Sequence, residues 1–414
     1  MNTLLHTHAR QIMQQAIREV LPDSAVKKAL EEFVPGKGKT VLVAAGKAAW
    51  QMAAAAMKIL KHIDRGIVIT KYGHCKSQLP GIVCAEAGHP VPDENGFAAT
   101  KEALAMVSDL SEDDRVVFLL SGGGSALFES PLIPGDMLQE ITRSLLACGA
   151  SITEINTIRK RLSGVKGGRF ALACAPAKVF AVALSDVLGD RADVIASGPV
   201  SPDCTTSEEA AEIVRKYALP VSEEVQELLR QETPKTLDNV EMKITGSVRL
   251  LCAAAQKACQ SLGYETELLT NGLCCEAREA GVWLASLAKE RLSGRKTPLA
   301  LIAGGETVVH LTGNGLGGRN QELALSAARE ISGLPCAVFS FGSDGTDGPT
   351  DAAGGYVDGD SAEALRSSGV DIEGVLENND SYPALKKIGG LLMTGPTGTN
   401  VNDVAVVLLY PNDK

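Results

Sequence analysis

Three aspartates crowd one short segment of the chain, Asp344, Asp347 and Asp351, with no lysine or arginine between them. Carboxylates this close repel one another unless a cation binds them or they point apart. The spacing does not fit a calcium-binding EF-hand loop, but a magnesium site completed by substrate phosphates needs only one or two carboxylates. Aspartate is also a common turn and capping residue, and that role stays open. A similar group, Asp186, Asp190 and Asp193, follows another apolar run.

Two further segments place a cation or glycines at the end of an apolar run. Lys47 stands among small residues where a predicted strand at 40–45 gives way to a helix. A cation at a helix N-terminus opposes the helix dipole, which favours binding of a phosphate or carboxylate over a solvated lysine. Ser121-Gly-Gly-Gly-Ser125 follows the predicted strand at 115–120. Its glycines could expose backbone N–H groups to an anion, although a plain tight turn fits equally well.

The segment from Gly313 to Gly318 matches the G-x-G-x-x-G pattern of dinucleotide-binding loops and precedes a predicted helix. A lone match is weak, and position 338, about 20 residues later, is valine where an acidic residue is wanted. Arg319 follows directly at the helix start, where it opposes the helix dipole. A bound anion would reverse that penalty, so we favour an anion-binding role for Arg319 over a solvated side chain.

The elements that position these residues follow from apolar runs that alternate with helical periodicity. Continuous apolar runs are typical of a parallel sheet covered on both faces. A polar, proline-containing stretch at 231–239 separates two such series. We therefore predict two α/β domains, residues 1–235 and 236–414, with the active site in a cleft between them. The first 20 residues are expected to form an amphipathic helix, and the alternating run at 307–312 a hairpin strand.

Composition excludes several classes of protein. The 414 residues carry a formal net charge of −10 without a basic block, which argues against nucleic-acid and anionic-membrane partners. No apolar run reaches the roughly 18 residues of a transmembrane helix, and the N-terminus lacks the features of a secretory signal. The ten cysteines include no C-x-x-C pair, which excludes a zinc ribbon. Scattered cysteines of this kind favour reduced thiols in the cytoplasm.

Ten segments in a fixed order resemble one known family over nearly the whole chain. They are Ala45-Gly-Lys-Ala48, Glu86-Ala-Gly-His-Pro90, Leu120 to Ala126, Asn156 to Ser163, Leu184 to Asp190, Ala196-Ser-Gly-Pro199, Gly304-Gly-Glu306, Gly317 to Glu322, Gly342 to Asp351 and Gly395 to Asp403. Together they are similar to the class II glycerate kinases, also called the MOFRL family. No single segment would be specific, but the ordered set is.

The resemblance implies an enzyme that phosphorylates D-glycerate at its 2-hydroxyl with ATP, giving 2-phosphoglycerate and ADP. It implies an N-terminal Rossmann-like α/β domain with a parallel sheet, a C-terminal α/β domain of the MOFRL type, and ATP and Mg²⁺ as cofactors. A homodimer is one option that the sequence leaves open. The alternatives are an NAD(P)H-dependent hydroxypyruvate reductase, which would use 313–318 as its dinucleotide loop, and a non-catalytic protein that binds a sugar acid.

Phosphoryl transfer needs mostly positioning and charge neutralisation, and the candidate residues divide accordingly. We expect Lys47 to neutralise an anion, Arg319 to bind one through a bidentate pair, and an aspartate to orient the attacking hydroxyl. The predicted catalytic residues are Lys47, Arg319, Asp186 and Asp344. The predicted substrate- or phosphate-binding residues are Ser121, Gly122, Gly123, Gly124, Ser125, Lys160, Glu306, Asn320 and Asn400, and the predicted metal ligands are Asp190, Asp347 and Asp351. The sequence does not apportion the roles among these carboxylates.

Overall fold

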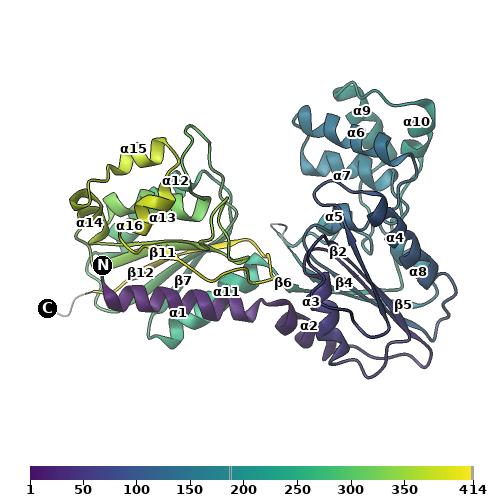
Figure 1. Cartoon of the computed structure of the whole chain (residues 1–414), viewed down its shortest axis with the longest axis horizontal. Coiled ribbons are helices and arrows are strands. Elements are labelled where there is room, and N and C mark those ends of the chain that lie inside the picture. The colour runs from purple at the N-terminus through teal and green to yellow at the C-terminus, as the bar shows by residue number, and fades with distance from the viewer. Residues whose placement is uncertain (186, 188, 412–414) are drawn as a thin grey trace. The chain divides into compact units, whose positions relative to one another are not determined.

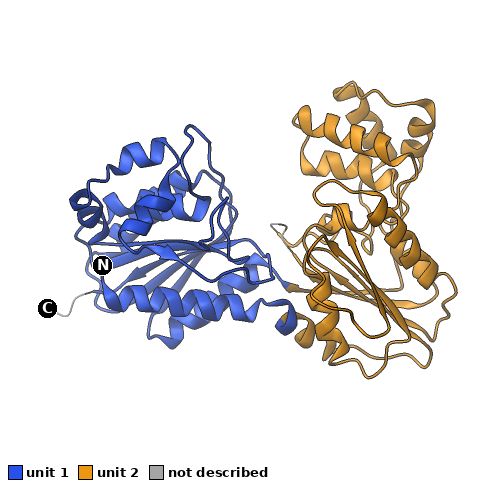
Figure 2. Cartoon of the chain, viewed as in Figure 1, with its two compact units in different colours: residues 1–24, 246–414 blue, residues 25–245 orange. Residues whose placement is uncertain are grey.

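Two compact units make up the chain (Figure 2). The computed structural model describes residues 1–185, 187 and 189–411. One unit spans Ala25–Thr245 and is called the Lys47 unit. The other combines Met1–Ser24 with Gly246–Lys414 and is called the Arg319 unit. Each unit has its own sheet, so the two-domain α/β architecture expected from the sequence is confirmed.

The Lys47 unit is built on a sheet with strand order β3-β2-β1-β4-β5-β6. The pairings from β3 to β5 are parallel. Alternate residues of β1 enter different cores, since Val43 packs on one face of the sheet and Leu42 on the other. The expectation of a parallel sheet covered on both faces is therefore confirmed. The strands are β1 Thr40–Ala45, β2 Arg65–Lys71, β3 Ile82–Ala87, β4 Arg115–Leu120, β5 Lys178–Leu184 and β6 Val240–Gly246.

Four helices of the Lys47 unit, α6, α7, α9 and α10, gather around a core of their own (Figure 1). Ile141, Ile158 and Val225 are among its buried side chains. The helices are α2 Pro22–Leu30, which crosses the division between the units, α3 Ala49–Met57, α4 Glu94–Val107, α5 Gly124–Leu127, α6 Gly135–Ala147, α7 Ile152–Arg161, α8 Arg169–Cys174, the 3₁₀ helix η1 Ile195–Ser197, α9 Ser207–Lys216 and α10 Glu223–Arg230.

The Arg319 unit has a mixed sheet of order β11-β10-β9-β12-β8-β7. Its central strand β12 runs antiparallel to both neighbours, β8 and β9. Helices α1 and α11 lie along one face of the sheet, and α12 and α13 lie on the other (Figure 1). The strands are β7 Glu265–Leu273, β8 Leu299–Gly305, β9 Cys336–Gly342, β10 Gly354–Asp358, β11 Leu391–Leu392 and β12 Asp403–Leu409. The helices are α1 Thr3–Glu19, α11 Val248–Ser261, α12 Ala277–Leu292, α13 Arg319–Glu330, α14 Ser361–Ser367, α15 Ile372–Glu377 and α16 Ser381–Lys387.

The N-terminal helix α1 belongs to the Arg319 unit, which corrects the predicted domain of residues 1–235. Its buried stripe packs on α11, His8 Nδ1 lies 2.8 Å from the Tyr264 hydroxyl, and the Asn2 N–H donates to Asp358 at 2.6 Å. Periodicity predicts that a helix has a buried face but does not identify the surface that covers it. The second boundary also shifts, from 235 to 245, because β6 joins the sheet of the Lys47 unit.

The predicted hairpin strand at 307–312 is absent from the described structure. The segment forms a loop with one isolated bridge, between Val308 and Glu276. Its alternation of apolar and polar residues therefore does not reflect a sheet. Separately, none of the described helices combines the length and the apolar character that a membrane crossing requires.

The contact between α12 and α13 leaves no room for a side chain at Gly281. A methyl group there would overlap the Leu323 carbonyl and the Ser326 hydroxyl. We expect Gly281→Ala to lower the free energy of unfolding by about 1–3 kcal/mol, because overpacking outweighs the roughly 1 kcal/mol that alanine gains over glycine inside a helix. Urea denaturation measures the change. In the matched variant Gly374→Ala, inside helix α15, the methyl group meets only the Asp371 carboxylate, so stability should hold or rise by up to about 1 kcal/mol. A Gly281→Ala protein as stable as the parent would contradict the packing argument.

Candidate active site

Lys47 lies where the loops after β1 and β4 meet, at the carboxyl ends of two central strands. In the strand order, β2 lies on one side of β1 and β4 on the other, so the direction in which strands are added reverses beside β1. Open α/β sheets bind ligands at such a topological switch point. The Lys47 N–H donates to the Gly122 carbonyl at 2.9 Å, and the Ala48 N–H donates to the Ser121 hydroxyl at 3.0 Å. Gly46 has φ +121°, and any side chain there would overlap Ser121. The two segments that the sequence singled out separately, Lys47 and the glycine-rich loop, are therefore in direct contact.

His89 completes this cluster, although the sequence analysis gave it no role. Gly123 has φ +84°, and a Cβ on it would lie 3.0 Å from His89 Nε2 and 3.3 Å from Lys47 Cγ. Burial, with the nearby charges of Lys47, Lys71 and His74, lowers the pKa of His89 to about 4. The imidazole is therefore neutral at pH 7. The available signal was its position just after β3, in the segment Glu86–Pro90 that supported the family resemblance.

Helix α7 supports the end of the glycine-rich loop. Arg159 donates to the Ser125 carbonyl at 2.8 Å. Asn156, one turn earlier, accepts from the Ser197 hydroxyl at 2.8 Å, and Ser197 Oγ lies 3.3 Å from Ser125 Oγ. Ser197 sits in a left-handed turn, with φ +61°, that packs against Gly124. Strained backbone conformations of this kind are frequent at ligand sites. Here the hydrogen bond from Ser197 to Asn156 of α7 holds the turn in place.

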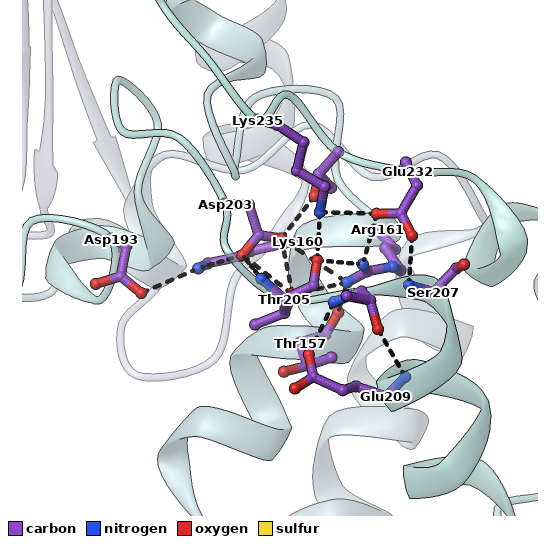
Figure 3. A network of polar contacts seen from close by, with 12 residues as sticks. Thr157, Lys160, Arg161, Asp193, Asp203, Thr205, Ser207, Glu209, Glu232 and Lys235 are labelled. Carbon is purple, nitrogen blue, oxygen red and sulfur yellow. Dashed lines mark hydrogen bonds and ion pairs between the residues drawn. The ribbon is translucent and has the colours of Figure 1, made fainter.

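Lys160 is on the same helix, but its side chain points into a buried ionic network (Figure 3). Its ammonium lies 3.0 Å from Asp203 and 3.6 Å from Asp193, and the side chain is 2% exposed. Arg161, fully buried beside it, donates to Thr205. Although burial alone would raise the pKa of Asp203, hydrogen bonding from Thr233 and the Lys160 charge lower it. This placement gives Lys160 a structural role and does not support substrate contact.

Arg319 is anchored at the centre of the Arg319 unit by an aspartate that the sequence analysis did not select. Asp403 is the first residue of β12, and it pairs with Gly305 and Gly342, the last residues of β8 and β9. Its carboxylate accepts from Arg319 Nε at 2.5 Å and Nη2 at 3.1 Å. The outer nitrogen, Nη1, donates to Glu306 at 2.9 Å. Burial raises the pKa of Asp403 to about 6 even though the Arg319 charge opposes the change.

The anion expected at the N-terminus of α13 is supplied by the protein itself. Asp347 is buried and accepts from the backbone N–H groups of Asn320 and Gln321 at 3.1 and 2.9 Å. It also accepts from both side-chain amides, at 3.2 and 3.0 Å. Burial still raises the pKa of Asp347. Asp347 therefore caps α13, and the Asn320 side chain is held between Asp347 and Ser340, which explains both residues without a metal or a bound phosphate.

The glycine-rich segment 313–318 also has internal partners. The N–H groups of Thr312 and Gly313 donate to the Asn379 side chain at 2.7 and 3.0 Å, and those of Asn314 and Leu316 donate to Asn378 and Asp380 at 3.2 and 2.8 Å. Side chains at Gly313 or Gly315 would overlap Asn378. These glycines permit a close approach between two loops, and the N–H groups of Gly313, Asn314, Gly315 and Leu316 already have partners within the protein.

The remaining candidates do not form a metal centre in the described structure. Asp351 accepts from the Tyr382 hydroxyl at 2.7 Å, and Asp344, half-buried, accepts from the Thr346 N–H at 3.0 Å. Asp190 belongs to the Lys47 unit, and Asp186 lies outside the described residues. Across residues 1–185, 187 and 189–411, no three histidine, cysteine or carboxylate side chains are placed to hold a metal ion. Asn400, half-buried before β12, stays a predicted contact, as do Asp186 and Asp344.

Comparison with known proteins identifies the family. Residues 8–230 match the domain of unknown function DUF4147, and residues 299–403 match the MOFRL family. The D-glycerate 2-kinase of Thermotoga maritima is 53% identical over 97% of each chain. A crystal structure of glycerate kinase from that organism has a TM-score of 0.96 and 52% identity, covering 99% of this chain and all of that one. A putative hydroxypyruvate reductase of Agrobacterium vitis is 40% identical, over 97% of this chain and 94% of that protein.

The protein is thus a two-domain α/β protein in which a lysine of one unit and an arginine of the other lie at the ends of central strands. The chain belongs to the glycerate kinase family with a MOFRL domain, which confirms the resemblance seen in the sequence.

The ionic network around Lys160 predicts a stability effect. We expect Lys160→Met to lower the free energy of unfolding by about 3–5 kcal/mol, because it leaves the Asp203 carboxylate buried without its ammonium partner. Urea denaturation measures this. Lys235→Met is the control, since Lys235 is half-exposed in the same network. Unchanged stability combined with weakened substrate binding would instead return Lys160 to the substrate site.

Proposed function

We propose that this protein is an ATP-dependent kinase that phosphorylates D-glycerate at the 2-hydroxyl, giving 2-phosphoglycerate and ADP. The observation that carries the proposal is near full-length similarity to a protein named D-glycerate 2-kinase. The geometry adds support, because each unit has a cationic residue at the ends of its central strands, and the side chain of one of them, Arg319, is held by two carboxylates. Phosphoryl transfer depends chiefly on such positioning and charge neutralisation.

In the Lys47 unit, the Lys47 ammonium and the backbone of the glycine-rich loop would bind an anionic group of the substrates. His89 adds a neutral imidazole beside them, and its low pKa keeps it from competing with Lys47 as a second positive charge. A neutral imidazole has one N–H donor and one acceptor nitrogen. It can therefore hydrogen-bond a substrate oxygen whether or not that oxygen carries a proton.

In the Arg319 unit, Asp403 would orient the guanidinium. Glu306 would bind its outer nitrogen until an anion of the substrates replaces Glu306. The two partners differ in exposure, since the Asp403 side chain is 8% exposed and that of Glu306 is 46% exposed. A ligand can displace the exposed partner while the buried one keeps the arginine aligned. The site would then offer a preorganised cation to a phosphate or carboxylate.

Magnesium enters this proposal as part of the nucleotide substrate. The geometry does not favour Asp347 and Asp351 as ligands of a metal, because Asp347 accepts four hydrogen bonds within the protein and Asp351 accepts one from the Tyr382 hydroxyl. Mg²⁺ in kinases commonly keeps several waters and is bound through substrate phosphates. We therefore propose the magnesium complex of ATP as the donor and assign no resident metal to the protein.

The reductase alternative has a weaker basis in the structure. It requires residues 313–318 to bind a pyrophosphate through backbone N–H groups, and those of Gly313, Asn314 and Leu316 already donate to Asn379, Asn378 and Asp380. A non-catalytic sugar-acid receptor would need no second cationic site on a separate unit. The kinase accounts for both Lys47 and Arg319.

Phosphorus NMR of the purified protein with D-glycerate, ATP and Mg²⁺ tests the proposal directly. Growth of a 2-phosphoglycerate signal together with ADP would establish both the reaction and its regiochemistry. A 3-phosphoglycerate signal would retain the kinase and overturn the position of transfer. Absence of transfer, with NADH consumed on hydroxypyruvate, would replace the kinase by the reductase.

Removing either cation should abolish most activity without unfolding the protein. We expect Lys47→Ala and Arg319→Ala each to lower kcat/KM by roughly 10²–10³-fold, the scale of losing one preorganised electrostatic contact to the transition state. Coupled assays of ADP release measure the loss, and circular dichroism checks the fold. Lys101→Ala and Arg329→Ala alter exposed cations on α4 and on the last turn of α13 and serve as controls. Near-normal turnover in either active-site variant would remove that residue from the mechanism.

The ion pair between Asp403 and Arg319 predicts an acid limb in the pH profile. As pH falls through about 6, Asp403 takes up a proton and loses the charge that fixes Arg319, so kcat/KM should fall. His89, with a pKa near 4, stays neutral over this range. In Asp403→Asn we expect low activity with that limb removed. Rate measurements between about pH 5 and 8 compare the two proteins. An unchanged limb in the variant would assign the titration to another group.

A further inference from the structure

A pocket of about 620 Å³ opens beside α13 in the Arg319 unit. Val308 and Leu311, from the loop after β8, form one part of its wall, and Pro349, from the turn after Asp347, forms another. Glu306, Arg319 and Glu322 contribute its charged groups. The volume falls in the range of about 300–1,000 Å³ that is typical of small-molecule sites.

The wall of this pocket presents apolar side chains that the fold leaves uncovered. Leu311 is 82% exposed and Val308 is 51% exposed. Covering such side chains stabilises a complex by roughly 25 cal/mol for each Å² of apolar surface removed from water. The pocket therefore favours a ligand with a substantial apolar surface. Glycerate has three carbons, each bearing oxygen, and offers no such surface.

The charges of the pocket determine which part of a nucleotide would fit. Glu322 is buried and paired with Arg278 at 2.6 Å, so its charge is compensated, and the one guanidinium of the described lining, Arg319, is already paired with Asp403 and Glu306. The half-exposed Glu306 can accept from hydrogen-bond donors such as ribose hydroxyls or an amino group, and the lining residues that the structure describes include no unpaired cation that would bind phosphate inside the pocket. The phosphates are then expected at its charged rim, where the outer nitrogen of Arg319 can exchange Glu306 for an anion.

We propose that this pocket binds the purine base and ribose of the phosphate donor, an inference that rests on the proposed kinase function. The segment 313–318 thereby acquires a role different from that of a dinucleotide loop. Its N–H groups are bonded to residues 378–380, and Gly313, Gly315, Gly317 and Gly318 line the pocket with backbone. The glycines would therefore contact the nucleoside and would not bind the phosphates.

Neutral adenosine tests the pocket separately from the cationic groups, because it carries no phosphate. Isothermal titration of the full-length protein with adenosine should show binding that Leu311→Asp weakens roughly tenfold or more. Val308→Asp is a second variant in the same wall. Leu316→Asp is the matched control, since Leu316 is exposed on the same loop, at 41%, but does not line the pocket. Both leucines face solvent, so neither change should lower the melting temperature.

Steady-state kinetics on the same variants gives the second readout. We expect Leu311→Asp to raise KM for ATP roughly tenfold or more, with KM for glycerate unchanged and the control like the parent. Adenosine binding and KM for ATP that are both insensitive to Leu311→Asp and Val308→Asp would overturn the pocket assignment. A rise in KM for glycerate alone would also overturn it, because the pocket would then bind the acceptor.

The failure of this inference is distinguishable from failure of the proposed function. If the parent protein transfers phosphate to glycerate, but adenosine binds equally well to the parent and to Leu311→Asp, the protein is a kinase whose nucleoside site lies elsewhere. A protein that binds adenosine in a Leu311-dependent way but transfers no phosphate would support the pocket assignment and contradict the proposed kinase activity.

Discussion

The contact between the loops after β1 and β4 is the constraint on which the candidate site of the Lys47 unit depends. A lysine N–H donates to the Gly122 carbonyl, and Gly46 is required because Ser121 occupies the space of a side chain. This approach brings Lys47 beside Gly123, and the missing Cβ of Gly123 leaves room for His89. The positions of the cation and of the glycine backbone are therefore consequences of one close approach between two parallel strands and their loops, and His89 joins them from the segment after β3.

Internal carboxylates govern the chemistry of the Arg319 unit in a comparable way. Asp347 takes the position that a bound anion would occupy at the start of α13, and Asp403 fixes the inner edge of Arg319. Burial raises the pKa of both carboxyl groups, so each ionised form depends on its donors. An arginine whose inner partner is fixed and whose outer partner is half-exposed can exchange one anion for another without losing its orientation.

The parts of the molecule that local sequence could predict are those determined by neighbouring residues. The parallel sheet and the positions of Lys47 and of the glycine-rich loop, each just after a strand, follow from apolar runs that end in small residues. The parts it could not predict depend on distant partners. Asp403 lies 84 residues from Arg319, and the side chains that accept from the 313–316 backbone lie 64 to 66 residues away. Helix α1 was predictable as a helix, but its packing surface on α11 was not.

Glycine-rich segments illustrate why the same local pattern can have opposite physical meanings. At 121–125, a glycine in the left-handed region creates space beside a cation and an imidazole, and this favours a ligand. At 313–318, the glycines let the chain approach residues 378–380, whose side chains then occupy the N–H groups. Composition is nearly the same in the two segments, and what differs is the second segment of chain that packs against each. A glycine-rich loop therefore identifies a close approach, and the atoms at that approach decide whether a ligand or the protein itself takes the hydrogen bonds.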